Sequence, residues 1–210
     1  MIDSTILIRG GTVVTMDAER RVVARGDVLI EGDRIGAVGE RIRRPPPARL
    51  IDASGCAVIP GLVQTHVHLC QTLFRGMADD LPLLLWLRGR IWPLEGAHDA
   101  RSMRASAELG LTELLRGGTT TILDLGSVRH QDEVFRSMER SGIRGVSGKS
   151  MMDAGVGVPR GLRETRTSSL AESLRLARRW DGAANGRLGY AFGPRFILSC
   201  SERLLREVAN

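Results

Sequence analysis

The chain has 210 residues, of which 42% are hydrophobic and 26% charged, a globular composition that excludes a disordered chain or a collagen-like fibre. Its formal net charge of +6 comes from arginines spread among acidic residues, with Lys149 the only lysine, and this pattern does not indicate a nucleic-acid partner. The longest apolar run, around 81–87, is interrupted by Pro82 and falls far short of the roughly 20 residues that a membrane span needs.

The cysteines and the N-terminus indicate the compartment. Cys56, Cys70 and Cys200 are widely spaced and form no Cys-x-x-Cys pair, which favours a reducing compartment over a disulfide framework or a thiolate metal site. The first residues lack the basic stretch and long apolar core of a secretory signal. We therefore expect a cytoplasmic protein that has neither a nucleic-acid nor a membrane partner.

Residues 1–60 have the pattern of a β unit. Short β-rich runs at 6–14, 27–30, 34–38 and 50–58 are separated by turn residues such as Glu31-Gly32-Asp33, which is typical of hairpins in a small sheet. The three consecutive prolines at 45–47 cannot donate backbone hydrogen bonds to a sheet, so they mark a loop or a sheet edge.

After residue 61 the pattern changes to alternating strands and helices. Strands are predicted at 62–69, 119–125, 143–147 and 187–197, and helices at 102–116, 131–140, 168–180 and from 202 onward. Ser168 and Ser201 are expected to cap the last two helices. Four strand–helix repeats predict a parallel α/β architecture, either a doubly wound sheet or half of an eight-fold barrel. No Gly-rich dinucleotide fingerprint follows the first strand, which favours the barrel.

The strongest candidate for chemistry is His66-Val67-His68, at the end of the first predicted parallel strand. Side chains two positions apart on a strand project to the same face. Two neutral imidazoles at the C-terminal mouth of a barrel strand are therefore placed to hold one divalent metal ion. His-x-His alone is a weak signal, because either ring can be an ordinary core residue, but two of the four histidines of the chain lie here. We interpret them as metal ligands.

Several motifs resemble the amidohydrolase superfamily. The stretch IPGLVQTHVHL at 59–69 is similar to its strand-one signature. Further similar stretches are QTLFRG at 71–76, DLPLLLWL at 80–87, WPLE at 92–95, LLRGGTTT at 114–121, GKSMMD at 148–153 and FGPRFILSC at 192–200. Together they cover essentially the whole chain and resemble the branch that holds methylthioadenosine/S-adenosylhomocysteine deaminases, 5′-deoxyadenosine deaminases, guanine deaminases and triazine hydrolases.

The resemblance implies a partial (β/α)8 barrel of the TIM type at 61–210, comprising its first four βα units, preceded by a small N-terminal β-sandwich portion at 1–60. Proteins of this family are about twice as long, since a barrel alone needs roughly 250 residues, and the sequence stops at Asn210 early in a predicted helix. We therefore expect a truncated chain. The family's proton-transferring Glu and Asp and its remaining metal-ligating histidines lie on later strands, so the catalytic residues are expected beyond Asn210 and this chain is expected to be inactive alone.

The activity that the resemblance implies is hydrolytic deamination of an aminopurine or its nucleoside, of the 5′-deoxyadenosine, S-adenosylhomocysteine or guanine type. The water would be activated by one divalent metal ion, zinc or iron, for which His66 and His68 are ligands. A chlorotriazine-type hydrolase and a non-catalytic binding module are the alternatives. The expected partner is a small heterocyclic molecule, and the full-length protein is expected to form a homo-oligomer.

Four residues match substrate-binding positions of the resembling enzymes. Gln71 and Arg195 resemble the ring-recognising pair of guanine deaminases, although methylthioadenosine/S-adenosylhomocysteine deaminases have His where Arg195 stands. Trp86 is expected to pack against the purine or its ribose, with a plain core aromatic as the alternative. Glu95 is expected to accept hydrogen bonds from ribose hydroxyls, with a surface acid at a helix end as the alternative.

Five further side chains have a chemical and a structural interpretation. Lys149, at the end of the third strand, is either an active-site cation or an ordinary strand-end cation. His130 and His98 are interpreted as a solvated loop residue and as part of a helix N-terminus. Cys70 is interpreted as a small buried residue rather than a nucleophile, and Asp124 as a structural carboxylate.

Overall fold

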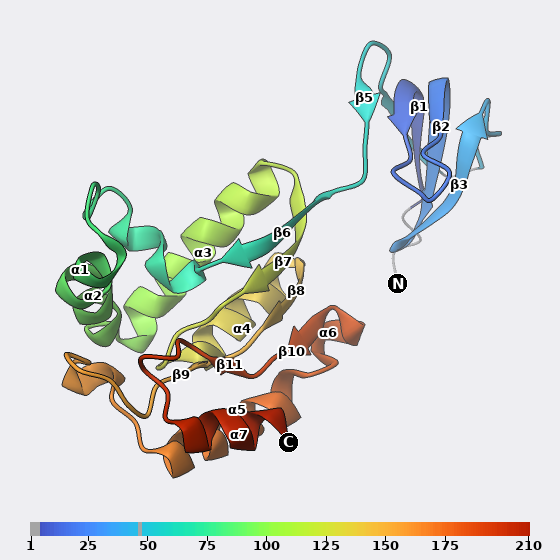
Figure 1. The fold of residues 1–210 in the computed structure, drawn as a ribbon. Coiled ribbons are helices and arrows are strands. Elements are labelled where there is room, and N and C mark those ends of the chain that lie inside the picture. Colours follow the sequence, from blue (N-terminus) through green and yellow to red (C-terminus); the bar gives the residue numbers. More distant parts are fainter. Residues whose placement is uncertain (1–4, 46–47) are drawn as a thin grey trace. The chain divides into compact units, whose positions relative to one another are not determined.

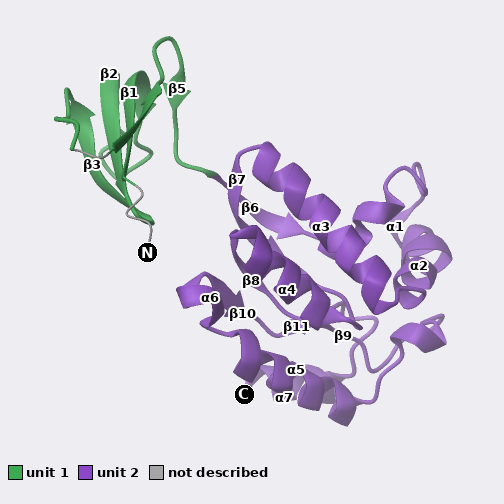
Figure 2. Ribbon diagram, turned by 180° about the vertical axis from the view of Figure 1, so that it is seen from behind, with its two compact units in different colours: residues 1–61 green, residues 62–210 purple. Residues whose placement is uncertain are grey.

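The structure is a computed structural model that describes residues 5–45 and 48–210. The chain divides into two compact units, residues 1–61 and residues 62–210 (Figure 2), and each is described by itself. In the part of the chain that the structure describes, no helix combines the length and the apolar character required to cross a bilayer.

The first unit is one β-sheet with the strand order β3-β2-β1-β4, in which β5 also pairs with β1. The strands are β1 (Thr5–Val14), β2 (Val22–Glu31), β3 (Arg34–Glu40), β4 (Ala48–Asp52) and β5 (Ala57–Val58). The antiparallel pairing of β2 with β3 closes through Gly32, whose φ of +62° is a left-handed conformation that favours glycine. Pro45 lies outside any strand, whereas Pro46 and Pro47 lie outside the described residues.

The second unit is built on a four-stranded sheet with the order β10-β8-β7-β6. Its strands β6 (Leu62–Val67), β7 (Thr119–Asp124), β8 (Arg144–Ser147) and β10 (Leu188–Tyr190) are all parallel. The helices α3 (Ala100–Arg116), α4 (Gln131–Ser141), α5 (Arg166–Trp180) and α7 (Glu202–Ala209) alternate with them (Figure 1). The parallel α/β architecture predicted from the alternating pattern is confirmed.

Short elements connect these strands and helices. They are η1 (Leu69–Phe74), α1 (Leu83–Trp86), η2 (Leu87–Ile91), α2 (Trp92–Gly96), η3 (Arg160–Leu162), α6 (Ala183–Gly186) and the parallel pair β9 (Ser150–Met151) and β11 (Gly193–Pro194). The first predicted strand is shorter than expected, because the 3-10 helix η1 begins at Leu69. The fourth predicted strand, 187–197, is divided into β10 and β11.

The predicted N-cap of α7 is confirmed, whereas α5 has a different N-cap from the predicted one. Ser201 caps α7, and its hydroxyl accepts a hydrogen bond from the N–H of Leu204 at 3.1 Å. Helix α5 begins earlier than predicted. Its N-cap is Thr165, and Ser168 completes a capping box by binding back to the N-cap backbone. Ser168 therefore stabilises the same helix end from the third helical position.

The core of the second unit lies on one face of the sheet. It consists of buried side chains from α3, α4, α5 and the strands they cover, including Met103, Leu111, Ile122, Phe135, Met138, Leu176 and Leu188. The opposite face carries exposed apolar side chains, with Val63 63% and Val146 38% accessible. One face of β7, β8 and β10 is therefore buried under helices, whereas residues 62–66 of β6 are exposed among the described residues.

Candidate functional site

The two histidines of the His-x-His motif lie at the C-terminal end of β6. Val67, between them, packs against the helix-side core, so the alternation of the strand directs His66 and His68 to the opposite, open face. Their ring centroids are 5.2 Å apart, and the ring planes are inclined by 70°. The structure thus brings together the pair that the sequence predicted.

The environment of His68 suits a metal ligand. Its Nδ1 is buried and has no hydrogen-bond partner, which is unusual for a buried polar atom. Burial lowers the pKa of His68 to about 4, and the charges of Arg195 and His66 act in the same direction against that of Glu95. The imidazole is therefore neutral at physiological pH, the state that coordinates a metal ion. The described residues contain no group of three or more His, Cys, Asp or Glu side chains that could hold a metal ion, so no third residue of these types joins the histidine pair among them.

A buried carboxylate fixes the backbone that follows His68. Asp124, at the end of β7, accepts a hydrogen bond from the N–H of Leu69 at 2.9 Å and another from the hydroxyl of Ser147 at 2.6 Å. Burial raises the pKa of Asp124, and these hydrogen bonds oppose the rise. Asp124 thereby links the ends of β6, β7 and β8, in agreement with its interpretation as a structural carboxylate.

His98 supports the same corner from the start of α3. Its Nε2 lies 2.8 Å from the carbonyl oxygen of Cys70, its Nδ1 lies 2.9 Å from the hydroxyl of Ser102, and its ring stacks on Phe74 at 5.0 Å between centroids. His98 therefore not only belongs to the N-terminus of α3 but also holds η1 in place directly after the histidine pair. Sequence reasoning missed this role, because 28 residues separate the two contacting positions.

Three of the four predicted substrate-binding residues form one hydrogen-bonded cluster. Gln71 Nε2 donates to Glu95 Oε1 at 2.7 Å. Arg195 forms a bidentate ion pair with the same carboxylate: Nη2 donates to Oε1 at 2.9 Å, and Nη1 donates to Oε2. The side chain of Glu95 is fully buried, and that of Arg195 is 11% exposed. Burial alone would lower the pKa of Arg195, but the hydrogen bond and the charge of Glu95 raise it.

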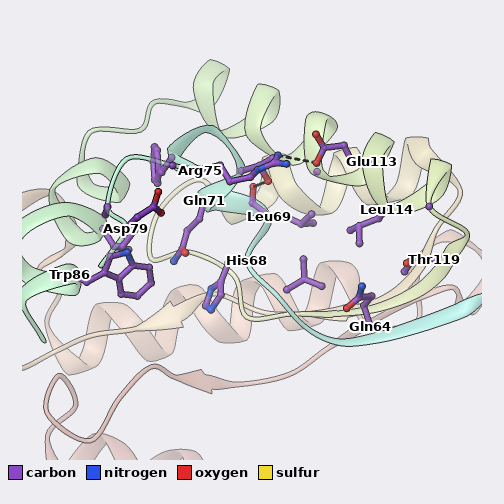
Figure 3. A pocket seen from close by; sticks show the side chains of 18 of the residues that line it. Gln64, His68, Leu69, Gln71, Arg75, Asp79, Trp86, Glu113, Leu114 and Thr119 are labelled. Atoms are coloured by element: carbon purple, nitrogen blue, oxygen red, sulfur yellow. Dashed lines mark hydrogen bonds and ion pairs between the residues drawn. The ribbon is translucent and has the colours of Figure 1, made fainter. Parts of the chain in front are cut away.

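A cavity of about 590 Å³ lies beside this cluster. His68, Gln71 and Trp86 line it together, and Figure 3 shows these three side chains facing the same space. Gln64 and Thr119 line the part of the cavity beside β6, an edge strand among the described residues. Trp86 thus lies on the wall of a cavity that His68 also lines.

Lys149 is buried inside the second unit. It is fully buried, and its Nζ donates to Glu164 Oε2 at 2.6 Å and to the carbonyl oxygen of Ser150 at 2.9 Å. Burial lowers the pKa of Lys149, and Glu164 opposes that effect. The two interpretations of Lys149, an active-site cation and an ordinary strand-end cation, did not include this buried ion pair. Its partner Glu164 carried no sequence signal.

The two remaining candidates agree with their structural interpretations. Cys70 is buried, and burial followed by the charges of Glu95 and Asp124 raises the pKa of its thiol, which makes it a poor nucleophile. His130 is exposed in the loop before α4, in a left-handed conformation with φ of +59°.

Comparison with known proteins identifies the family. The amidohydrolase family matches residues 57–210, more than half of the chain. The chain is 40% identical over 209 residues to the 5′-deoxyadenosine deaminase of Methanothermobacter thermautotrophicus, and 39% identical over 207 residues to the 5-methylthioadenosine/S-adenosylhomocysteine deaminase of Symbiobacterium thermophilum. These alignments cover 100% and 98% of this chain but 46% of each relative.

Solved structures agree with the sequence matches. The structure is similar to guanine deaminase of E. coli, with a TM-score of 0.84 and 32% identity over 97% of this chain and 50% of the other. It is also similar to atrazine chlorohydrolase from Arthrobacter aurescens, a structure described as complexed with zinc, with a TM-score of 0.85 and 27% identity over 97% of this chain and 49% of the other. The protein belongs to the amidohydrolase family, and the chain spans about half the length of the relatives it matches.

Proposed function

We propose that this chain is the N-terminal half of a metal-dependent aminohydrolase that deaminates an aminopurine or its nucleoside. The observation that carries the proposal is the pair of adjacent imidazoles at the end of β6, of which His68 lines a cavity. His68 has a buried nitrogen without a partner, and Gln71 and Trp86 line the same cavity.

The strand order supports half of a TIM-type barrel. Among the described residues, the strands of the parallel sheet lie side by side in the order in which they occur in the sequence, β6, β7, β8 and β10. The strand order does not reverse, as in a barrel and unlike the switch point of a doubly wound sheet. The exposed Val63 and Val146 lie on the face that would be the barrel interior. In this proposal, residues 61–210 form the first four βα units, and residues 1–60 contribute a portion of a β-sandwich.

The metal ion would be divalent, and the zinc bound to the similar atrazine chlorohydrolase favours zinc. When bound, such an ion supplies a Lewis acid that lowers the pKa of water to about 7. His66 and His68 would hold it with further ligands from outside this chain, because a catalytic zinc takes about three protein ligands. In this proposal the proton-transferring carboxylates also lie outside the chain.

The remaining cavity residues would orient the heterocycle. Trp86 offers a flat apolar surface for a purine ring, and the amide of Gln71 lies on the same cavity wall. The relatives named as deaminases of 5′-deoxyadenosine and of methylthioadenosine or S-adenosylhomocysteine favour a 6-aminopurine nucleoside. Similarity to the atrazine chlorohydrolase supports the second candidate, hydrolysis of a chlorotriazine.

The test compares products released by the full-length protein that contains this chain. Ammonia release from 5′-deoxyadenosine, S-adenosylhomocysteine and guanine is measured beside chloride release from a chlorotriazine, with zinc content measured on the same sample. We expect ammonia from at least one purine, and loss of both zinc and turnover in His66→Ala and His68→Ala. Chloride release alone would establish the second candidate. A stable protein that neither retains metal nor turns over any of these compounds would be a binding module.

A further inference from the structure

Glu95 lies where three separate segments of the chain meet. It belongs to α2, and its carboxylate binds Gln71 of η1 and Arg195, which directly follows β11. The two partners are 24 and 100 residues away in sequence. One carboxylate therefore joins two segments of the connection between β6 and α3 to the residue that follows β11.

Both carboxylate oxygens of Glu95 accept hydrogen bonds from within the chain. Oε1 accepts from Gln71 and from one arm of Arg195, and Oε2 accepts from the other arm. The side chain has no exposed surface. For a ligand hydroxyl to bind this carboxylate, the ion pair would have to open and leave a largely buried guanidinium unpaired, which is costly.

The partners of Glu95 keep unused hydrogen-bonding groups, whereas Glu95 itself has no exposed surface. Each arm of Arg195 has a second N–H, its Nε has another, and the side chain retains some exposure. Gln71 lines the cavity between Trp86 and His68 (Figure 3), and its amide carries a free acceptor oxygen in addition to the donor that Glu95 uses. Flat amide and guanidinium groups match the edge of a planar heterocycle better than a sugar.

We propose that Glu95 is a positioning residue, one that fixes Gln71 and Arg195 in the orientation that meets the heterocycle and does not itself contact the ligand. This inference rests on the proposed function, and it differs from the direct ribose contact that family resemblance implies for Glu95. It follows that loss of the carboxylate impairs a free aminopurine base and the corresponding nucleoside equally.

The test compares Glu95→Gln with the unmodified full-length enzyme on a base and on its nucleoside. We expect kcat/KM to fall about tenfold or more for both, as for the loss of a hydrogen bond to a charged group, with factors that agree within about threefold of each other. A fall confined to the nucleoside would show direct ribose contact and overturn the proposal. Glu108→Gln is the matched control, because Glu108 also pairs with an arginine, Arg140, but is 51% exposed.

A double-mutant cycle supplies a second, independent readout. If Glu95 acts through Arg195, the double variant Glu95→Gln/Arg195→Gln has nearly the same kcat/KM as Arg195→Gln alone. If the two residues contact the ligand independently, the fold-losses of the two single variants multiply in the double variant. If Glu95→Gln does not fold, Glu95→Asp is used instead in the same comparison, because it keeps the negative charge that pairs with Arg195.

Equilibrium binding separates failure of this inference from failure of the proposed function. A full-length protein that binds base and nucleoside without deaminating either would disprove the activity, and the Glu95→Gln comparison would then be made on dissociation constants. Equal weakening of both ligands would still support the positioning role. A protein that binds neither ligand would overturn both proposals.

Discussion

Asp124 accepts a hydrogen bond at 2.9 Å from the backbone N–H of Leu69, the residue that directly follows His68. The neighbouring strand β7 thus fixes the point at which β6 turns into η1. We expect Asp124→Ala to lower the free energy of unfolding by about 2–4 kcal/mol, because it leaves the buried N–H and the hydroxyl of Ser147 without an acceptor. Urea denaturation measures this change.

Ser147→Ala is the control for that prediction. It removes the hydroxyl that donates to Asp124 and accepts from Gln131 at 2.7 Å, and it leaves the bond between Asp124 and Leu69 in place. It is therefore expected to cost less than Asp124→Ala, about 1–2 kcal/mol. Equal losses in the two variants would contradict the central role of Asp124.

The buried ion pair between Lys149 and Glu164 predicts a non-additive mutant series. Lys149→Met leaves Glu164 buried without its partner and is expected to cost about 3–5 kcal/mol, as is Glu164→Gln, whereas the double change to apolar residues of similar size costs much less. Urea denaturation of the two single variants and of the Lys149→Met/Glu164→Met variant gives the coupling energy. Single losses that add up in the double variant would show that the two groups act independently.

Asp132 predicts a pH dependence of stability. It accepts the indole N–H of Trp180 at 2.8 Å and pairs with Arg175. Burial raises the pKa of Asp132, but the hydrogen bonds from Trp180 and Arg175 outweigh burial and leave the pKa below its ordinary value. A carboxyl group of this kind stabilises the fold fully above its unfolded pKa, about 4, and this contribution is lost as the pH falls through the folded pKa.

The pH prediction is checked by comparison with Asp132→Asn, which keeps an acceptor for Trp180 and lacks the charge. The difference in the free energy of unfolding between the two proteins is expected to be largest near neutral pH and to shrink below about pH 5. Denaturation is followed by tryptophan fluorescence at each pH. A difference that stays constant from pH 7 to pH 3 would disprove the role of the charge.

Gly148 predicts a steric effect at the boundary between β8 and β9. A β-carbon at this position would lie 1.8 Å from the carbonyl oxygen of Ala191, so Gly148→Ala forces two backbones apart and is expected to destabilise the protein by about 3 kcal/mol. Gly89→Ala is the matched control, because a β-carbon there meets no atom within 4 Å. Thermal denaturation compares the two, and an unchanged midpoint for Gly148→Ala would contradict the close approach.

The sequence predicted what depends on local periodicity. The alternation of β6 placed His66 and His68 on one face, and the repeated strand–helix pattern predicted the parallel sheet. Contacts between residues that are distant in the sequence could not be predicted. Nothing in the neighbourhood of Lys149 indicates Glu164, and the separation of β10 from β11 follows backbone packing around Gly148 that has no local signature. The cluster around Glu95 was recognised only as separate family positions, because hydrogen bonds between distant segments leave no periodic trace.

The orientation of the histidine pair depends on one extra residue in β6. The step from Gln64 to Val67 covers three residues on β6 but only two on β7, from Ile122 to Asp124. Such a bulge exchanges the faces of the side chains that follow it, so Val63 is exposed whereas Val67, four positions later, packs against the helix-side core. Deletion of Thr65 would therefore remove the extra residue and keep both histidines on the face opposite to Val67. The length of this stretch thus constrains the motif less than the length of a regular strand would.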